Sequence, residues 1–192
     1  MKTLIINGSP RKNGDSMSIA NEMIKYLEGE VKIVHTYYDN ISPCLDCRYC
    51  MNHKGCCIDD EMQVVYQLFD EVDHVIVTSP LYFSELTGKL LSFASRLQTY
   101  YVRRVLKKDS SFELKKKNAV LILTGGGDGK PDPAISRARI LFKNINAEKV
   151  GTIMSLETEI IPGKDDLNAL NKAKELALTL NKLYKTTSEE RS

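Results

Sequence analysis

Five short apolar runs, separated by stretches with helical periodicity, constrain the fold of this chain more than any other feature. The runs are rich in Val, Ile and Leu, as strands of a parallel sheet buried on both faces usually are. They span Lys2–Ile6, Val31–Tyr37, His74–Thr78, Asn118–Thr124 and Lys149–Ser155. Amphipathic stretches cover approximately Ser16–Glu28, Glu61–Glu71, Gly88–Leu106, Ala134–Ile145 and Lys164–Tyr184. This alternation predicts an α/β fold built on a doubly wound sheet.

Right-handed crossovers leave few ways to arrange five such strands. The common arrangement has the strand order 2-1-3-4-5 and places its ligand cleft where strand one neighbours strand three. We therefore expect a parallel sheet with helices on both faces, and functional loops after strands one, three and four. A chain of 192 residues, 42% of them hydrophobic, suits one domain, which we place at residues 1–185. The segment 186–192 is polar and predicts a frayed tail.

Charge and hydropathy narrow the range of partners. Lys and Arg total 27 against 25 Asp and Glu, and the net charge of +2 favours neither nucleic acid nor an anionic membrane surface. No run approaches the roughly 20 apolar residues of a membrane span, and the apolar N-terminal stretch is too short for a signal sequence. We expect a cytoplasmic protein that binds neither nucleic acid nor membrane.

The loop after the first strand combines hydroxyls, glycines and cations at the start of a helix. It reads Gly8-Ser9-Pro10-Arg11-Lys12-Asn13-Gly14-Asp15-Ser16 and continues into a helical pattern at Met17. Free backbone N–H groups and the helix dipole at such a position favour a bound phosphate, and Gly14 lets the backbone approach it closely. The alternative is a polar turn in which Asp15 or Ser16 only caps the helix. A cap explains neither the two cations nor the glycine pair.

The same loop excludes two common nucleotide sites. It lacks the Gly-Lys-Ser/Thr ending of an ATP-binding loop, and it does not spell the dinucleotide fingerprint. A mononucleotide such as FMN is the ligand that remains.

Two further loops carry residue types that suit a flavin ring. After strand three, the segment Pro80–Ser84 is a proline-broken turn with the aromatic side chains of Tyr82 and Phe83. After strand four, Thr124–Gly127 supplies glycines where a backbone can lie close to a planar ligand. Their N–H groups are also placed to stabilise charge on a reduced flavin. The alternatives are aromatic residues that close the end of the sheet and a glycine loop that is simply flexible.

These loops resemble those of a known family. The segment Gly8–Gly14 closely resembles the phosphate loop of the flavodoxin-like NAD(P)H-dependent FMN reductases, which the iron-sulfur flavoproteins share, although the family usually has Asn and Thr at Asp15 and Ser16. The family's Ser-Pro-x-Tyr loop, which wraps the isoalloxazine ring, matches Ser79–Tyr82 and precedes a helix with a lysine and an arginine. With the analysis above, the resemblance implies a flavodoxin-like fold and FMN contacts from Ser9, Arg11, Asn13, Gly14, Ser16, Met17, Pro80, Leu81, Tyr82, Phe83, Ser84, Thr124, Gly125, Gly126 and Gly127.

All five cysteines lie between Cys44 and Cys57, which indicates local redox or metal chemistry rather than a disulfide framework. The compact spacing is compatible with a [4Fe–4S] cluster and matches the iron-sulfur flavoproteins. The four matching ligands are Cys44, Cys47, Cys50 and Cys56. Relatives in the reductase family keep a similar loop without needing iron, so free or disulfide-capable thiols stay open as an alternative. Zinc more often takes two separated cysteine pairs.

The resemblance implies an enzyme in which NAD(P)H reduces FMN. The electrons would pass to a small acceptor such as a quinone or nitro compound, to a redox protein, or to an iron-sulfur centre. No side chain need act as an acid or base, so we assign no catalytic residue. The alternative is a non-enzymatic electron carrier of the flavodoxin or iron-sulfur flavoprotein type, although carriers are typically acidic. A flavin-free metal-binding module would leave the phosphate loop unexplained. Relatives are usually dimers or tetramers, so we expect a homodimer or tetramer.

Overall fold

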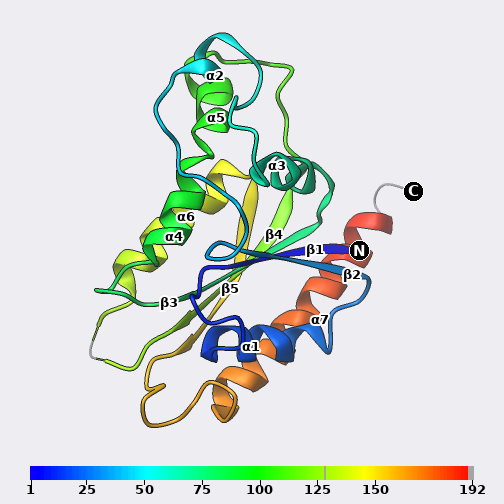
Figure 1. The fold of residues 1–192 in the computed structure, drawn as a ribbon. Helices are drawn as coiled ribbons and strands as arrows, with labels where there is room; N and C mark the ends of the chain where they lie inside the picture. The colour runs from blue at the N-terminus through cyan, green and yellow to red at the C-terminus, as the bar shows by residue number, and fades with distance from the viewer. Residues whose placement is uncertain (128, 190–192) are drawn as a thin grey trace.

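The computed structural model describes residues 1–127 and 129–189, and within them one five-stranded sheet forms the centre of the molecule (Figure 1). The strands are β1 Lys2–Asn7, β2 Glu30–His35, β3 His74–Pro80, β4 Lys117–Thr124 and β5 Ala147–Ser155. Their order is β2-β1-β3-β4-β5 and all neighbours are parallel, which confirms the predicted topology. The carboxyl ends of the strands therefore meet at one edge of the sheet.

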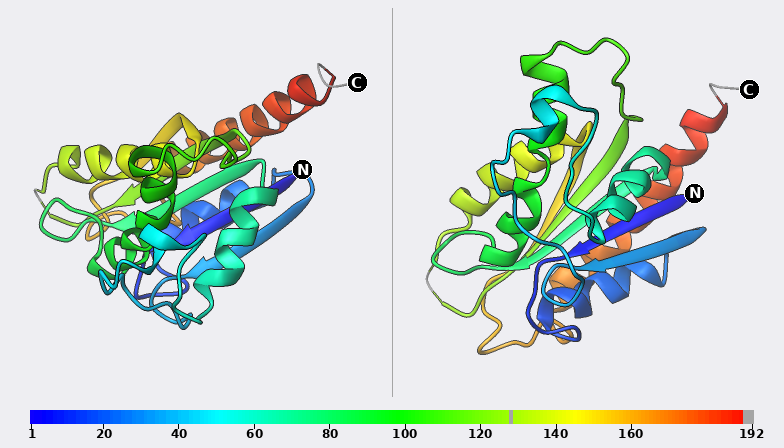
Figure 2. Two further views of the ribbon diagram at one scale, coloured as in Figure 1. Left: turned by 90° about the horizontal axis from the view of Figure 1, so that it is seen from above. Right: turned by 45° about the horizontal axis from the view of Figure 1, so that its top comes forward.

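Helices cover both faces of this sheet. They are α1 Asp15–Ile24, α2 Tyr49–Asn52, α3 Met62–Glu71, α4 Gly88–Ser95, α5 Gln98–Tyr101, the π-helix η1 Val102–Leu106, α6 Asp132–Asn144 and α7 Leu167–Glu189. Helices α1 and α7 lie on one face, and α3, α4 and α6 lie on the other (Figures 1 and 2). None of the helices among the described residues has the length and apolar character needed to cross a membrane.

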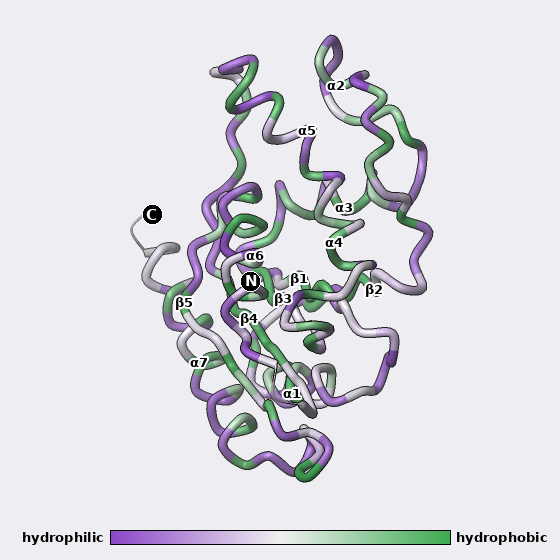
Figure 3. The backbone as a smooth tube through the Cα atoms, turned by 90° about the vertical axis from the view of Figure 1, so that its left-hand side faces the viewer, coloured by the Kyte–Doolittle hydropathy of each residue, from purple (hydrophilic) through white to green (hydrophobic). Residues whose placement is uncertain are grey.

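Side chains point alternately to the two faces along the central strands, which explains how one sheet contributes to two hydrophobic cores. In β1, Leu4 and Ile6 pack in the core under α3, α4 and α6, whereas Ile5 packs in the core under α1 and α7. All three side chains are fully buried. Because successive strand residues point to opposite faces, a strand buried on both sides reads as an unbroken apolar run. Figure 3 shows that β4 is mostly hydrophobic, whereas the segment around α2 mixes hydrophilic and hydrophobic residues.

The single helix expected over Gly88–Leu106 is wrong, because the segment breaks into α4, α5 and η1. The break coincides with Ser95 and Arg96. The Ser95 hydroxyl donates to the carbonyl of Ser92 at 2.6 Å, and the carbonyl of Arg96 accepts from the Tyr66 hydroxyl at 2.9 Å. The N–H of Arg96 bonds the Phe93 carbonyl at 3.1 Å, a three-residue spacing that tightens the last turn. Polar side chains thus compete for the backbone where the helix ends.

The C-terminal helix is longer than the sequence pattern predicts. Residues 186–189, expected in a frayed tail, belong to α7, and the hydroxyls of Thr186 and Thr187 bond the carbonyls of Lys182 and Leu183. These bonds let polar threonines continue a helix without an apolar face. The remainder of the predicted tail, 190–192, lies outside the described residues.

Candidate functional site

Asn7, the last residue of β1, fixes the start of the phosphate loop. Its side-chain Oδ1 accepts hydrogen bonds from the Ser9 N–H at 2.9 Å and the Thr78 hydroxyl at 3.1 Å. Its Nδ2 lies 3.0 Å from Nδ1 of His35. Asn7 is fully buried and joins the ends of three strands. Sequence reasoning did not single it out, although a polar residue that closes an apolar strand is a usable signal.

Gly8 occupies a position that no other residue type fits. A Cβ there would lie 2.8 Å from Cδ2 of Leu90 and 2.9 Å from the carbonyl oxygen of Thr78. Its N–H bonds that same carbonyl at 2.8 Å, and its own carbonyl accepts from the Thr87 hydroxyl at 2.6 Å. The phosphate loop is therefore packed directly against β3 and the first turn of α4.

The N-terminus of α1 offers free donors for an anion. Gly14 precedes the helix in an extended conformation and supplies no side-chain cap, so the N–H groups of Asp15, Ser16 and Met17 have no intrahelical acceptor. Ser16 and Ser9 are buried beside them. Of the predicted contacts, Met17 packs its side chain in the core, which leaves only its N–H for a ligand.

The carboxylate of Asp15 does not occupy this anion site. It accepts from the N–H of Gly163 at 3.0 Å and forms an ion pair with Arg11 at 3.2 Å. The predicted contacts Arg11 and Asn13 are exposed on the same loop. Lys12 lies 4.6 Å from the centroid of the Tyr38 ring. The acidic residue in the helix's first turn is thus neutralised locally, and the free N–H groups stay open to an anion.

The loop after β3 makes a strained turn that displays two aromatic side chains. Tyr82 and Glu85 exchange two backbone hydrogen bonds of 3.0 Å, with Phe83 and Ser84 between them at φ values of +53° and +64°. Left-handed conformations cost non-glycine residues about 1–2 kcal/mol each. Phe83 is fully exposed and Tyr82 is about half exposed. Such strain gathers at ligand-binding sites, where it presents a group to a partner.

The loop after β4 contacts this turn through Gly125. The Leu81 N–H bonds the Thr124 carbonyl at 2.7 Å, and a Cβ on Gly125 would lie 3.7 Å from the Leu81 side chain. The N–H of Gly125 is already bonded to the carbonyl of Ser155 at 2.9 Å, whereas those of Gly126 and Gly127 have no partner within the part of the chain described. A Cβ on Gly126 would meet the Glu159 side chain at 2.4 Å. Within the described segment Thr124–Gly127, the donors left for a ligand are therefore those of Gly126 and Gly127.

The five cysteines and Arg96 line one cavity of about 290 Å³ between the loop that carries α2 and the segment of α5 and η1. Cys44, Cys50 and Cys56 are half-buried, whereas Cys47 and Cys57 are exposed and their Sγ atoms are 3.6 Å apart. Helices α2 and α5, which contribute to its lining, lie at the opposite end of the molecule from α1 (Figure 1).

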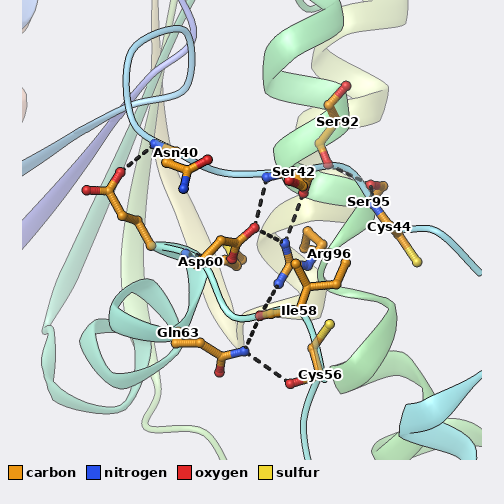
Figure 4. A network of polar contacts seen from close by, with 12 residues as sticks. Asn40, Ser42, Cys44, Cys56, Ile58, Asp60, Gln63, Ser92, Ser95 and Arg96 are labelled. Atoms are coloured by element: carbon orange, nitrogen blue, oxygen red, sulfur yellow. Dashed lines mark hydrogen bonds and ion pairs between the residues drawn. The ribbon is translucent and has the colours of Figure 1, made fainter. Parts of the chain in front are cut away.

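A buried ion pair closes the base of the cysteine loop, as Figure 4 shows. Arg96 Nη1 lies 2.6 Å from Oδ2 of Asp60 and donates to the carbonyl of Ser42 at 3.0 Å. Both charged side chains are almost completely shielded from solvent. Asp60 also accepts from the N–H groups of Ser42 at 2.9 Å and Met62 at 3.1 Å. Residues 42 and 60 are thereby held together, and the cysteines lie on the segment between them.

The thiols of the loop differ in acidity. A hydrogen bond from the Tyr49 N–H, together with one from the Cys57 thiol, lowers the pKa of Cys47. Burial raises the pKa of Cys50. Across the described residues, no three His, Cys, Asp or Glu side chains converge as they would around a single metal ion. A four-iron cube, in contrast, offers a separate iron to each of four thiolates, so it does not require the sulfurs to meet at one point.

Helix α4 connects the two regions. At its first turn, the Thr87 hydroxyl bonds Gly8 and accepts from the Leu90 N–H at 3.4 Å. At its last residue, the Ser95 hydroxyl accepts from the Cys44 N–H at 2.9 Å, and Arg96 follows. An eight-residue helix is about 12 Å long, and the contacts with Gly8 and with Cys44 lie at its two opposite ends. Arg96, which follows directly after α4, thus serves the cysteine loop.

Comparison with known proteins gives a consistent result. A family model described as NADPH-dependent FMN reductase matches residues 1–159. An iron-sulfur flavoprotein of Archaeoglobus fulgidus is 29% identical over 189 residues, which is 97% of this chain and 81% of that protein. One from Methanosarcina thermophila is 30% identical over 129 residues, and the match covers 66% of this chain and 64% of the relative, just under two thirds of its length. A solved FMN-dependent NADH-azoreductase from Bacillus anthracis, in complex with FMN, superposes with a TM-score of 0.67 at 15% identity, covering 94% of this chain and 99% of that one.

Proposed function

Because the chain belongs to the NADPH-dependent FMN reductase family, we propose that FMN binds with its phosphate at the N-terminus of α1 and its ring between the loops after β3 and β4. When bound, FMN supplies the chemistry by accepting a hydride from NAD(P)H and passing electrons onward. The observation that carries the proposal is the set of free N–H groups at α1, beside two buried serines and with Asp15 turned away. These donors suit a phosphate dianion.

The side chains of the site bind and orient the cofactor, and none is assigned a proton to transfer. Ser9 and Ser16 would donate to the phosphate, and the charge of Arg11 would favour it. The free N–H groups of Gly126 and Gly127 are suited to a polar ring edge. The remaining proposed contacts are Asn13, Gly14, Met17, Pro80, Leu81, Tyr82, Phe83, Ser84, Thr124 and Gly125.

Replacing Ser16 tests the phosphate site. Ser16→Ala should weaken FMN binding about tenfold or more, since a hydrogen bond to a charged group contributes roughly 1.5–3 kcal/mol. Ser16→Glu should abolish binding, because its carboxylate would compete for the same N–H groups. The control is Ser18→Ala, whose hydroxyl bonds the Gly14 carbonyl at 3.2 Å and should not reach the phosphate. Fluorescence titration with FMN measures all three, and unchanged affinity in both Ser16 variants would contradict the assignment.

The proposed acceptor is a small oxidised molecule such as a quinone or nitro compound, or an iron-sulfur centre in the cysteine cavity. Adding NADPH or NADH to the FMN-loaded protein without oxygen should bleach the flavin absorbance. A flavin that stays oxidised would favour the alternative of a non-enzymatic carrier. The exposed side chain of Phe83 suits contact with a second copy of the chain, so we propose a homodimer or tetramer.

We propose that Cys44, Cys47, Cys50 and Cys56 can hold a [4Fe–4S] cluster. These thiols line one cavity, and soft thiolates are the preferred ligands of such clusters. The names of the two archaeal relatives support the proposal. With no cluster, the same residues are thiols and the enzyme is a two-electron reductase.

Serine variants test the cluster ligands. In protein prepared and reconstituted anaerobically, replacing any of the four cysteines should reduce iron and sulfide per chain, because a serine hydroxyl is a poor substitute for a thiolate. Cys57→Ser is the matched control and should leave the iron content unchanged. Iron and sulfide assays with a visible spectrum decide the outcome. Wild-type protein that contains neither element after reconstitution would rule the cluster out.

A further inference from the structure

Cys57 is the thiol that the four-cysteine pattern leaves over, yet it is not isolated. Its Sγ lies 3.6 Å from Sγ of Cys47, and both residues are exposed. A disulfide requires a sulfur separation of about 2.05 Å, so the two side chains must move closer together to form the bond. We propose that Cys47 and Cys57 form a reversible disulfide when the chain meets a small-molecule disulfide.

Hydrogen bonds from α3 anchor the chain on both sides of Cys57. The Gln63 side-chain Nε2 donates to the carbonyls of Cys56 at 3.1 Å and Ile58 at 2.7 Å, so both neighbours of Cys57 are anchored to α3. Figure 4 shows these bonds next to the Arg96 pair that closes the loop. The contact between the thiols therefore belongs to an ordered loop.

The backbone on both sides of Cys47 is strained. Its neighbours Asp46 and Arg48 adopt left-handed conformations with φ values of +48° and +60°, which are unfavourable for residues other than glycine. In this strained segment the Cys47 Sγ lies next to that of Cys57.

The reaction is a thiol–disulfide exchange with a balanced outcome. One thiolate of the pair attacks the small disulfide and releases one molecule of small thiol. The second thiolate attacks the resulting mixed disulfide and releases another. The two cysteines are oxidised, the small disulfide is reduced to two thiols, and the cysteine protons end on those thiols. Closure within a short loop has a high effective concentration, so the mixed disulfide should not accumulate.

The disulfide has a consequence for the rest of the loop. Cys47 belongs to the proposed cluster ligands, so the bond to Cys57 would remove one ligand of four. Oxidised protein should then take up less iron than reduced protein. The disulfide itself goes beyond the proposed function, because it requires neither flavin nor iron.

The experiment uses the full chain, freed of iron with a chelator, reduced, and mixed with oxidised glutathione in the absence of oxygen. Two of the five thiols should become unreactive. The mass of the chain should fall by that of two hydrogen atoms, and no glutathione should remain attached. Cleavage after Arg48 and Lys54 by trypsin separates the cysteines into peptides 33–48, 49–54 and 55–89. The proposal expects peptide 33–48 linked to peptide 55–89.

Single variants identify the sulfurs. Cys57→Ser should abolish the link and retain glutathione on Cys47, whereas Cys56→Ser and Cys44→Ser should keep the link. A link within peptide 33–48, a link to peptide 49–54, persistence of the link in Cys57→Ser, or glutathione adducts alone would each overturn the proposal. Iron uptake is measured separately on reduced and oxidised protein. If reduced protein takes up no iron, the cluster proposal fails while the peptide map still decides the disulfide.

Discussion

Arg96→Ala should lower the free energy of unfolding by about 3–5 kcal/mol, the usual cost of removing one partner from a buried ion pair. The pair with Asp60 is fully enclosed, and the substitution would leave the carboxylate without its countercharge. It would also remove the hydrogen bond from Arg96 to the Ser42 carbonyl at the start of the cysteine loop. Urea unfolding followed by circular dichroism measures the loss.

A double-mutant cycle separates the interaction energy between Arg96 and Asp60 from the contributions that each side chain makes by itself. Arg96→Met with Asp60→Leu should destabilise less than either single change, because neither charge is then left alone in the interior. Lys172→Ala removes an ion pair with Glu175 on the surface of α7 and is the control, with little effect expected. Equal losses for Arg96→Ala and Lys172→Ala would show that the Arg96–Asp60 pair does not support the loop.

The pair also predicts how stability depends on pH. Burial opposes ionisation of Asp60, but the bonds from Arg96, Ser42 and Met62 outweigh it and hold the pKa of this carboxyl below its ordinary value. A carboxylate with a lowered pKa in the folded state stabilises the fold above its unfolded pKa of about 3.9. That contribution is lost as the pH falls below this value, and Arg96→Ala should flatten the decline.

The sheet was predictable because its central strands are recognisable in the sequence as short apolar runs. Runs such as Val75–Val77 and Val120–Leu123 are buried on both faces, and no arrangement except a covered parallel sheet explains them. The turn between β1 and α1 was also predictable, since Gly8 follows the first strand and Gly14 directly precedes the first helix. The hydrogen bonds that support this turn were less predictable from the sequence. Asn7 contacts side chains of β2 and β3, which are brought together only in the folded chain.

The cysteine region shows where sequence reasoning stops. The spacing indicated one local site, but periodicity alone gave a continuous helix through Arg96, where the structure has a break. Periodicity indicates which residues share a face of a helix. It does not indicate that Arg96 is buried and forms an ion pair with Asp60 on the other side of the loop. The proximity of Cys57 to Cys47 was equally hidden, because their spacing of ten residues in the sequence does not indicate that the folded loop brings the two sulfurs together.

Asn7→Leu should lower the free energy of unfolding by about 2–4 kcal/mol and weaken FMN binding more than tenfold. The substitution leaves the Ser9 N–H and the Thr78 hydroxyl buried without an acceptor, and each such group costs about 1–3 kcal/mol. The loss of FMN affinity follows because Ser9 begins the proposed phosphate loop. Urea unfolding and fluorescence titration measure the two effects.

Thr3→Val is the matched control for this experiment. Thr3 lies on the same strand with the same burial, but its Oγ1 has no hydrogen-bond partner among the described residues. Removing an unpaired buried hydroxyl should leave stability unchanged or slightly higher, and FMN affinity unaffected. If Asn7→Leu behaves like Thr3→Val, the strand ends do not depend on Asn7.

The contact with His35 adds a pH signature to the same prediction. Oδ1 of Asn7 accepts from Ser9, so Nδ2 faces His35 and Nδ1 of the ring must be unprotonated. Burial lowers the pKa of His35, which means that the fold favours the neutral ring. Its stabilising contribution is complete above the unfolded pKa of about 6.5 and declines as the pH falls below it. In Asn7→Leu this hydrogen bond is absent, so the decline between pH values of about 6.5 and 5 should be smaller than in the wild-type protein.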